Sequence, residues 1–155
     1  MTDDQTQSGA SIGATCSDRL CIAIAQSKLT FDQRANGAEI RMQMRRAAEA
    51  GARLIQFTEG AIFGYKSEVG QHAPANWDVD WSVLRNELET TAALAGELQL
   101  WTVVGSNHPL TPPNRPHNSL YVISDAGELV ARYDKRLLSF NEVTNWPSNG
   151  RQAGR

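Results

Sequence analysis

The sequence contains few of the side chains that form redox or metal sites. Its two cysteines, Cys16 and Cys21, fit neither a C-x-x-C redox pair nor a zinc motif with a matching second half. The three histidines, His72, His108 and His117, are too dispersed for a metal motif on one helix, and neighbouring prolines and asparagines place them in expected loops. We therefore predict no metal and no cofactor, and neither cysteine is a candidate nucleophile.

The chain also lacks a large excess of charge of one sign, and it lacks long apolar runs. A formal net charge of -2, with basic residues scattered along the chain, gives no electrostatic footprint for nucleic acid. No apolar run has the length needed to cross a bilayer. Residues 1–18 lack the apolar core of a signal peptide, so we interpret them as a disordered polar extension. These absences predict a cytoplasmic protein without nucleic-acid or membrane partners.

The composition that is present indicates an ordinary globular domain. The 155 residues are 41% hydrophobic and 21% charged, which is typical of a chain that buries one core. We expect residues 19–155 to form that unit. No G-x-G-x-x-G run follows the first apolar segment, so nucleotide binding is not expected.

Three apolar segments alternate with two helical patterns, as in two βαβ units. Strands are expected at 20–26, 53–57 and 100–105, and the first is expected to be buried on both faces because it is rich in branched apolar residues. Such units have parallel strands and right-handed crossovers. The sequence therefore predicts an α/β fold.

Both expected helices begin with capping signals. Asn36 and Glu39 form a capping-box-like pair, which predicts a first helix over about 37–50, closed by Gly51. Asp80 is the expected N-cap of the second helix. The apolar face of that helix consists of Leu84, Leu88, Ala92, Ala95 and Leu98.

The last elements that can be assigned form a β-hairpin. Segments 118–124 and 128–134 are strand-like and are joined by residues 125–127, which read D-A-G and place glycine where a positive φ is needed. Residues 66–80 and 106–117 are expected to be loops, the second because it contains four prolines. A hairpin beside two βαβ units makes the expected sheet mixed.

Two charged side chains stand just beyond strand ends. Glu59 lies in T-E-G-A-I-F-G-Y after the second strand, and Lys135 lies in Y-D-K-R-L-L after the hairpin, with Glu142 seven residues later. A carboxylate can transfer protons and a lysine can stabilise an oxyanion, which is hydrolase chemistry. The alternative interpretations are that Glu59 caps or solvates a turn and that Lys135 belongs to an exposed charge run.

The chain resembles the nitrilase, or carbon-nitrogen hydrolase, superfamily in four places: the opening strand ending in Gln26, T-E-G-A-I-F-G-Y, the N-S-L-Y-V-I-S and D-A-G-E-L-V hairpin, and Y-D-K-R-L-L. The resemblance implies a four-layer α-β-β-α sandwich, of which this chain is a part, and a Glu-Lys-Cys triad. It implies that Glu59 is the general base, Lys135 the cation that stabilises the intermediate, and Glu142 an additional acid. It also implies homo-oligomers for the complete family protein.

The chain departs from the family pattern in three places. Thr58 stands where the family usually has proline, and Arg136 and Ser139 stand where histidine and proline are common. No cysteine follows Cys21, whereas the family's catalytic cysteine lies well downstream of the lysine. We therefore expect residues 19–155 to be the N-terminal portion of a carbon-nitrogen hydrolase domain, truncated before the catalytic cysteine and inactive by itself.

Two functions remain open on the sequence. The first is hydrolysis of a carbon-nitrogen bond in a small-molecule amide, carbamoyl compound or nitrile. The second is a non-catalytic binding or assembly module, which keeps the front half of the fold and pairs with a full-length relative through exposed sheet edges. A continuation of the reading frame into a strand that ends in cysteine would favour the first.

Overall fold

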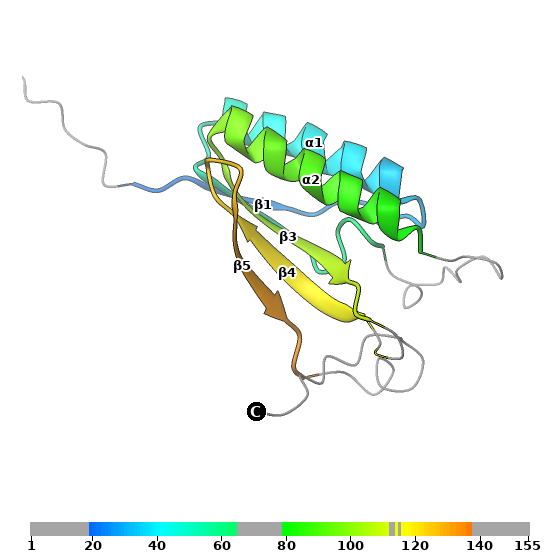
Figure 1. Ribbon diagram of the computed structural model, residues 1–155. Helices are drawn as coiled ribbons and strands as arrows, with labels where there is room; N and C mark the ends of the chain where they lie inside the picture. The colour runs from blue at the N-terminus through cyan, green and yellow to red at the C-terminus, as the bar shows by residue number, and fades with distance from the viewer. Residues whose placement is uncertain (1–18, 65–78, 112–113, 115, 138–155) are drawn as a thin grey trace, which may run out of the picture.

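The computed structural model describes residues 19–64, 79–111, 114 and 116–137, which form one five-stranded sheet with two helices on one face (Figure 1). The strands lie in the order β1-β2-β3-β4-β5. The elements are β1 (Ile22–Ala25), α1 (Gln33–Glu49), β2 (Leu54–Phe57), α2 (Trp81–Leu98), β3 (Trp101–His108), β4 (His117–Ile123) and β5 (Leu129–Asp134). This mixed α/β sheet, with two βαβ units and a hairpin, confirms the predicted fold class. The expected extension at 1–18, and all but the last two residues of the expected loop at 66–80, lie outside the described residues.

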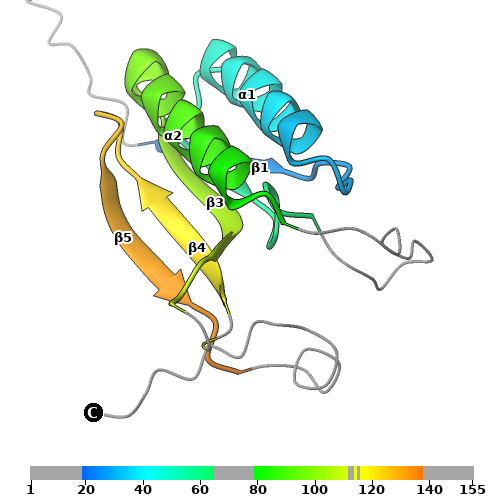
Figure 2. The same ribbon diagram turned by 45° about the vertical axis from the view of Figure 1, so that its right-hand side comes forward.

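The first three strands are parallel neighbours, as the βαβ pattern predicts. β1 pairs with β2 and β2 with β3, in registers that set Ile22 beside Leu54 and Leu54 beside Trp101. Two successive crossovers of the same hand, in the same direction along the sheet, put both helices on the same face. Figure 2 shows α1 and α2 side by side above that face.

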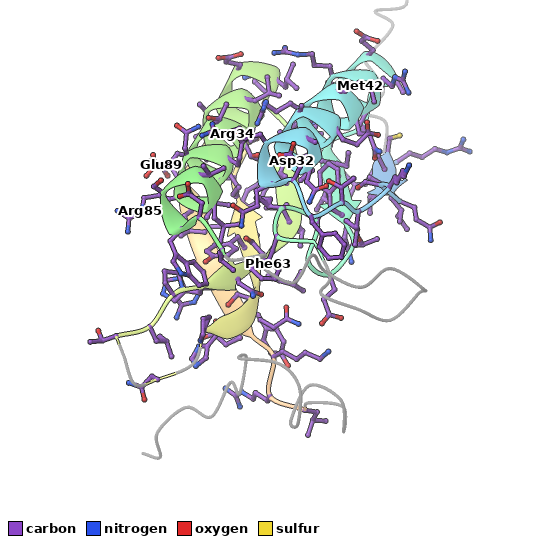
Figure 3. All side chains as sticks on the ribbon, turned by 90° about the vertical axis from the view of Figure 1, so that its right-hand side faces the viewer. Asp32, Arg34, Met42, Phe63, Arg85 and Glu89 are labelled. Carbon is purple, nitrogen blue, oxygen red and sulfur yellow. The ribbon has the colours of Figure 1, made fainter. Side chains whose placement is uncertain are left out.

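The first helix begins four residues earlier than the capping-box prediction. Asp32 is its N-cap, and Asp32 Oδ1 accepts hydrogen bonds from two backbone N–H groups of the first turn at 2.9 and 3.1 Å (Figure 3). Asn36 lies inside the helix, where its Nδ2 donates to the backbone oxygens of Thr30 and Ile62. The prediction was wrong because Asn36 uses its side chain to tie the helix to two other segments instead of capping it.

The second helix begins where the sequence predicts. Asp80 Oδ1 accepts hydrogen bonds from the Ser82 hydroxyl at 2.6 Å and from the backbone N–H groups of Ser82 and Val83 at 3.0 and 3.1 Å. These bonds, the Ser82 hydroxyl first among them, lower the pKa of Asp80. Within the described residues, neither α1 nor α2 has the length and apolar character needed to cross a membrane.

The third and fourth strands extend into the proline-rich segment that was expected to be a loop. β3 runs to His108 and β4 begins at His117, so only residues 109–116 connect them. Asn107 and Asn118 face each other in the antiparallel ladder. The loop prediction was wrong at both ends because the prolines lie outside the paired residues, and polar side chains do not prevent backbone pairing. Both histidines therefore belong to strands.

The hairpin between β4 and β5 has the predicted turn. The Ser124 N–H donates to the Glu128 carbonyl at 2.9 Å, and the Gly127 N–H donates to the Ser124 carbonyl at 3.0 Å. Gly127 has a φ of 78°, a value that favours glycine. A Cβ at this position would also lie 2.7 Å from the Ala92 carbonyl oxygen, so the turn packs closely against α2.

The hydrophobic core lies between the two helices and one face of the sheet. Its largest fully buried apolar side chains are Phe63, Ile40, Met44, Ile55, Ile62, Leu100, Ile123 and Val104. No described helix or strand covers the other face at β1, where Ile22 is 51% and Ile24 85% exposed. The expectation that the first strand is buried on both faces is therefore wrong for the described residues.

Candidate active site

Glu59 lies in a tight turn directly after β2. The T-E-G turn, residues 58–60, leaves the sheet where β2 ends, and Gly60 has a φ of 66° that favours glycine. The Ile62 N–H donates to the Gly105 carbonyl at 3.0 Å, and Phe63, 1% exposed, lies beneath the helices (Figure 3). The segment after Glu59 is thus held both by β3 and by the core.

Gly105 allows the T-E-G turn to rest on β3. A Cβ at Gly105 would lie 2.6 Å from the Gly60 nitrogen, 2.6 Å from the Thr58 carbonyl oxygen and 2.9 Å from the Glu59 Cα. A side chain there would displace the backbone that carries Glu59, because these contacts are with main-chain atoms. From the sequence, this glycine was predicted only to be the last residue of a strand.

Lys135 lies directly after β5, which β3 and β4 separate from β2, and its side chain reaches Glu59. Its backbone N–H donates to the Asn118 carbonyl at 2.8 Å, which fixes the residue beside β4. Its Nζ lies 2.8 Å from Glu59 Oε1, and the two side chains are 30% and 41% exposed. The structure therefore brings together the two charged residues that the sequence analysis selected. The third, Glu142, lies outside the described residues.

Asn118 is a third member of this cluster that the sequence analysis did not identify. Its Nδ2 donates to Glu59 Oε1, the same oxygen that Lys135 contacts. Two donors from neighbouring strands thus fix the orientation of one carboxylate. A signal was present in the sequence, because Asn118 is a polar residue at the start of an apolar strand within N-S-L-Y-V-I-S.

A polar network on the helix-facing side of β5 anchors the residue before Lys135. Asp134 accepts a hydrogen bond from the Ser119 hydroxyl at 2.7 Å, and it contacts Arg132 Nε at 2.9 Å and His117 Nδ1 at 3.0 Å. Burial by itself would raise the pKa of Asp134, but these contacts outweigh burial and lower it. Because successive strand residues point to opposite faces, the network fixes the end of β5 from the side opposite Lys135.

A second polar pair lies near this network. His108 Nδ1 is 2.9 Å from the Tyr121 hydroxyl. Burial lowers the pKa of His108 and raises the pKa of Tyr121 to about 12. Among the described residues, no three histidine, cysteine, aspartate or glutamate side chains are grouped to hold a metal ion.

The described cysteine lies far from the Glu59–Lys135 pair. Cys21 is exposed and precedes β1, whereas Glu59 follows the carboxyl end of the parallel neighbour β2. A strand rises about 3.3 Å per residue, so the four residues of β1 separate the two ends of the sheet by roughly 13 Å. Cys16 lies outside the described residues.

The chain is similar to proteins of known structure. The family described as carbon-nitrogen hydrolase matches residues 21–153. An amidase from Nesterenkonia sp. has a TM-score of 0.65 at 23% identity, covering 77% of this chain and 44% of the amidase. A double mutant of the amidase from Nesterenkonia sp. AN1, in complex with acrylamide, has a TM-score of 0.67 at 21% identity, covering 81% and 46%. The NitFhit protein of C. elegans has a TM-score of 0.63 at 22% identity, covering 76% and 28%.

No curated protein matches the chain. The chain spans less than half the length of each of these three structures. At identities of this size, the structural likeness establishes a shared fold.

Proposed function

The chain belongs to the carbon-nitrogen hydrolase family, and on that premise we propose that it carries part of the active site of a hydrolase for small amides, carbamoyl compounds or nitriles. The observation that carries this proposal is the 2.8 Å contact between Glu59 Oε1 and Lys135 Nζ. The two residues come from opposite sides of β3 and β4, so sequence proximity does not explain their meeting. Residues 19–155 form the N-terminal portion of the hydrolase domain in this proposal.

Each charged residue has a role that matches its chemistry. Glu59 accepts the proton of the attacking nucleophile, and Lys135 stabilises the negative charge that develops on the substrate as the bond to the nucleophile forms. Asn118 positions the Glu59 carboxylate through its hydrogen bond. Glu142 is proposed as an additional acid beside the lysine.

Among the described residues, no thiol lies beside Glu59 and Lys135. A structure of the Nesterenkonia sp. AN1 amidase contains acrylamide added at its active-site cysteine, whereas Cys21 lies at the opposite end of the sheet from Glu59. We infer that the thiol comes from polypeptide outside these residues. Homo-oligomers are proposed only for the complete protein.

We expect the purified 155-residue chain to turn over none of a panel of small amides, nitriles and carbamoyl compounds. A base and a cation without a nucleophile cannot form the covalent intermediate. Ammonia release measures the reaction. The matched control is a variant that carries Cys16→Ala, Cys21→Ala and Glu59→Gln. Turnover that survives in this variant would show that the site has been assigned to the wrong residues.

A second candidate function is a non-catalytic binding or assembly module. The exposure of Ile22 and Ile24 favours it, because both lie on β1, which pairs only with β2 among the described strands. A full-length relative that co-purifies with the chain would support this function. A chain that purifies alone as a monomer, in a cell that contains such a relative, would contradict it.

A further inference from the structure

Asn107 is a buried polar residue whose side-chain N–H group has no hydrogen-bond partner. It is 4% exposed, and its Nδ2 makes no hydrogen bond. A buried donor without an acceptor destabilises the folded state, because it has lost its hydrogen bonds to water. A ligand that brings an acceptor to this N–H would remove the cost.

The register of the sheet places Asn107 on the face that carries Glu59. Asn107 lies directly opposite Asn118, and directly paired residues share a face. Asn118 donates to Glu59, so that face is the one of the candidate site. The alternation along β3 agrees, because Val104 belongs to the helix-facing core and Gly105 and Asn107 therefore point away from it.

The Glu59 side chain passes over β3 beside Asn107. β3 separates β2, which Glu59 follows, from β4, which carries Asn118. The T-E-G turn rests on Gly105, where a Cβ would lie 2.9 Å from the Glu59 Cα. Because Gly105 and Asn107 are successive residues on that face, and Asn107 is paired with Asn118, Asn107 lies beside the path from the turn to Asn118. Asn107 thus borders the Glu59–Lys135 pair.

The Asn107 N–H, as a second hydrogen-bond donor beside the Lys135 ammonium, distinguishes a carbonyl group from a nitrile. A carbonyl oxygen has two lone pairs and accepts hydrogen bonds from two directions, whereas a nitrile nitrogen has one lone pair along its axis. With a carbonyl ligand, both the Lys135 ammonium and the Asn107 amide have an acceptor. Lys135 keeps its contact with Glu59 in either case. A nitrile nitrogen that faces Lys135 has no second lone pair for Asn107, so the buried Asn107 N–H stays without an acceptor, and sites built around such a donor discriminate against ligands that leave it unpaired.

We propose that Asn107 is a specificity-determining residue whose side-chain N–H donates to the carbonyl oxygen of the substrate, so that the site prefers amides and carbamoyl compounds to nitriles. The inference rests on the proposed function, because it takes the Glu59–Lys135 pair as the place where substrate binds. It goes further by naming the substrate class and the residue that selects it.

The experiment measures binding by the 155-residue chain, so it does not require turnover. Butyramide and butyronitrile, which differ at the carbon-nitrogen group, are titrated separately and followed by NMR chemical shifts. The unaltered chain is expected to bind butyramide more tightly. Asn107→Ala is expected to weaken butyramide binding by about fivefold to tenfold, the value of one hydrogen bond, and to leave butyronitrile binding unchanged. Asn107→Leu, which keeps the size of the side chain without its donor, is expected to do the same.

The matched control is Asn86→Ala. Asn86 is an exposed asparagine on α2, so its replacement should change the affinity for neither butyramide nor butyronitrile. If both Asn107 variants keep the preference for butyramide while Glu59→Gln weakens the binding of both ligands, the role of Asn107 is wrong and the proposed function stands. If the chain binds neither ligand, or if Glu59→Gln and Lys135→Met change neither affinity, the proposed function fails and the role of Asn107 with it.

Discussion

A single hydrogen atom at Gly105, in place of a side chain, gives the T-E-G turn room to rest on β3. We expect Gly105→Ala to force this turn away from β3, since the Cβ would lie 2.6 Å from two main-chain atoms. The free energy of unfolding should fall by about 1–3 kcal/mol, as for other overpacked sites, and the Glu59–Lys135 contact should be lost. Urea denaturation measures the first effect and the side-chain chemical shifts of Lys135 measure the second.

Ser106→Ala is the matched control for this substitution. Ser106 is the neighbouring residue on β3, points to the other face, and has a buried hydroxyl without a partner. Its removal should be neutral or slightly stabilising. A Gly105→Ala variant as stable as Ser106→Ala, with unchanged Lys135 shifts, would mean that the turn does not depend on the glycine.

At the scale of the element, Asp134 ties the end of β5 to β4. Its folded pKa is lowered, so the carboxylate contributes stability above its unfolded pKa and loses that contribution as the pH falls through the folded pKa. Asp134→Asn should therefore reduce the free energy of unfolding at pH 7 by about 1–3 kcal/mol. The difference from the unaltered chain should shrink on acidification below about pH 4, the usual pKa of an aspartate. Urea denaturation at both pH values measures it.

Asp125→Asn provides the comparison for this pH dependence. Asp125 lies 3.8 Å from Arg53, and both side chains are well exposed, at 37% and 66%. An exposed pair of this kind contributes little, so the variant should match the unaltered chain at both pH values. An equal loss of stability in the two variants would contradict the anchoring role of Asp134.

At the scale of the whole molecule, the described residues leave one face of the sheet exposed at β1. Ile24 is 85% exposed there, and exposed apolar sheet faces with unpaired edges promote association. We expect the 155-residue chain to self-associate. Ile24→Lys should reduce this association, measured by sedimentation velocity, without lowering the midpoint of thermal unfolding, because the side chain contributes little to the core.

Met42→Lys tests whether any added charge has the same effect. Met42 lies on the outer side of α1 (Figure 3) and is 38% exposed, so its replacement should leave the association unchanged. A soluble monomer that unfolds cooperatively without any substitution would contradict the expectation for the open sheet face.

Local patterns in the sequence determined most of the secondary structure. The alternation of apolar segments with helical patterns, the Asp80 cap and the glycine turn of the hairpin all act over a few residues, and each is found in the fold. The errors fall where a distant contact outweighs a local signal. Asn36 carries a capping pattern but binds Ile62, and Asn107 lies near prolines but pairs with Asn118.

The candidate site also combines residues that local sequence patterns identify with residues that only the tertiary structure brings together. The sequence by itself selected Glu59 and Lys135, because each is a charged residue just past a strand end and each lies in a stretch that resembles the family. Only the tertiary structure decided that they meet, and that Gly105, Asn118 and Asn107 surround them. The physical reason is that sheet order and register, which relate residues far apart in sequence, determine which side chains share a face, and no local pattern encodes that relation.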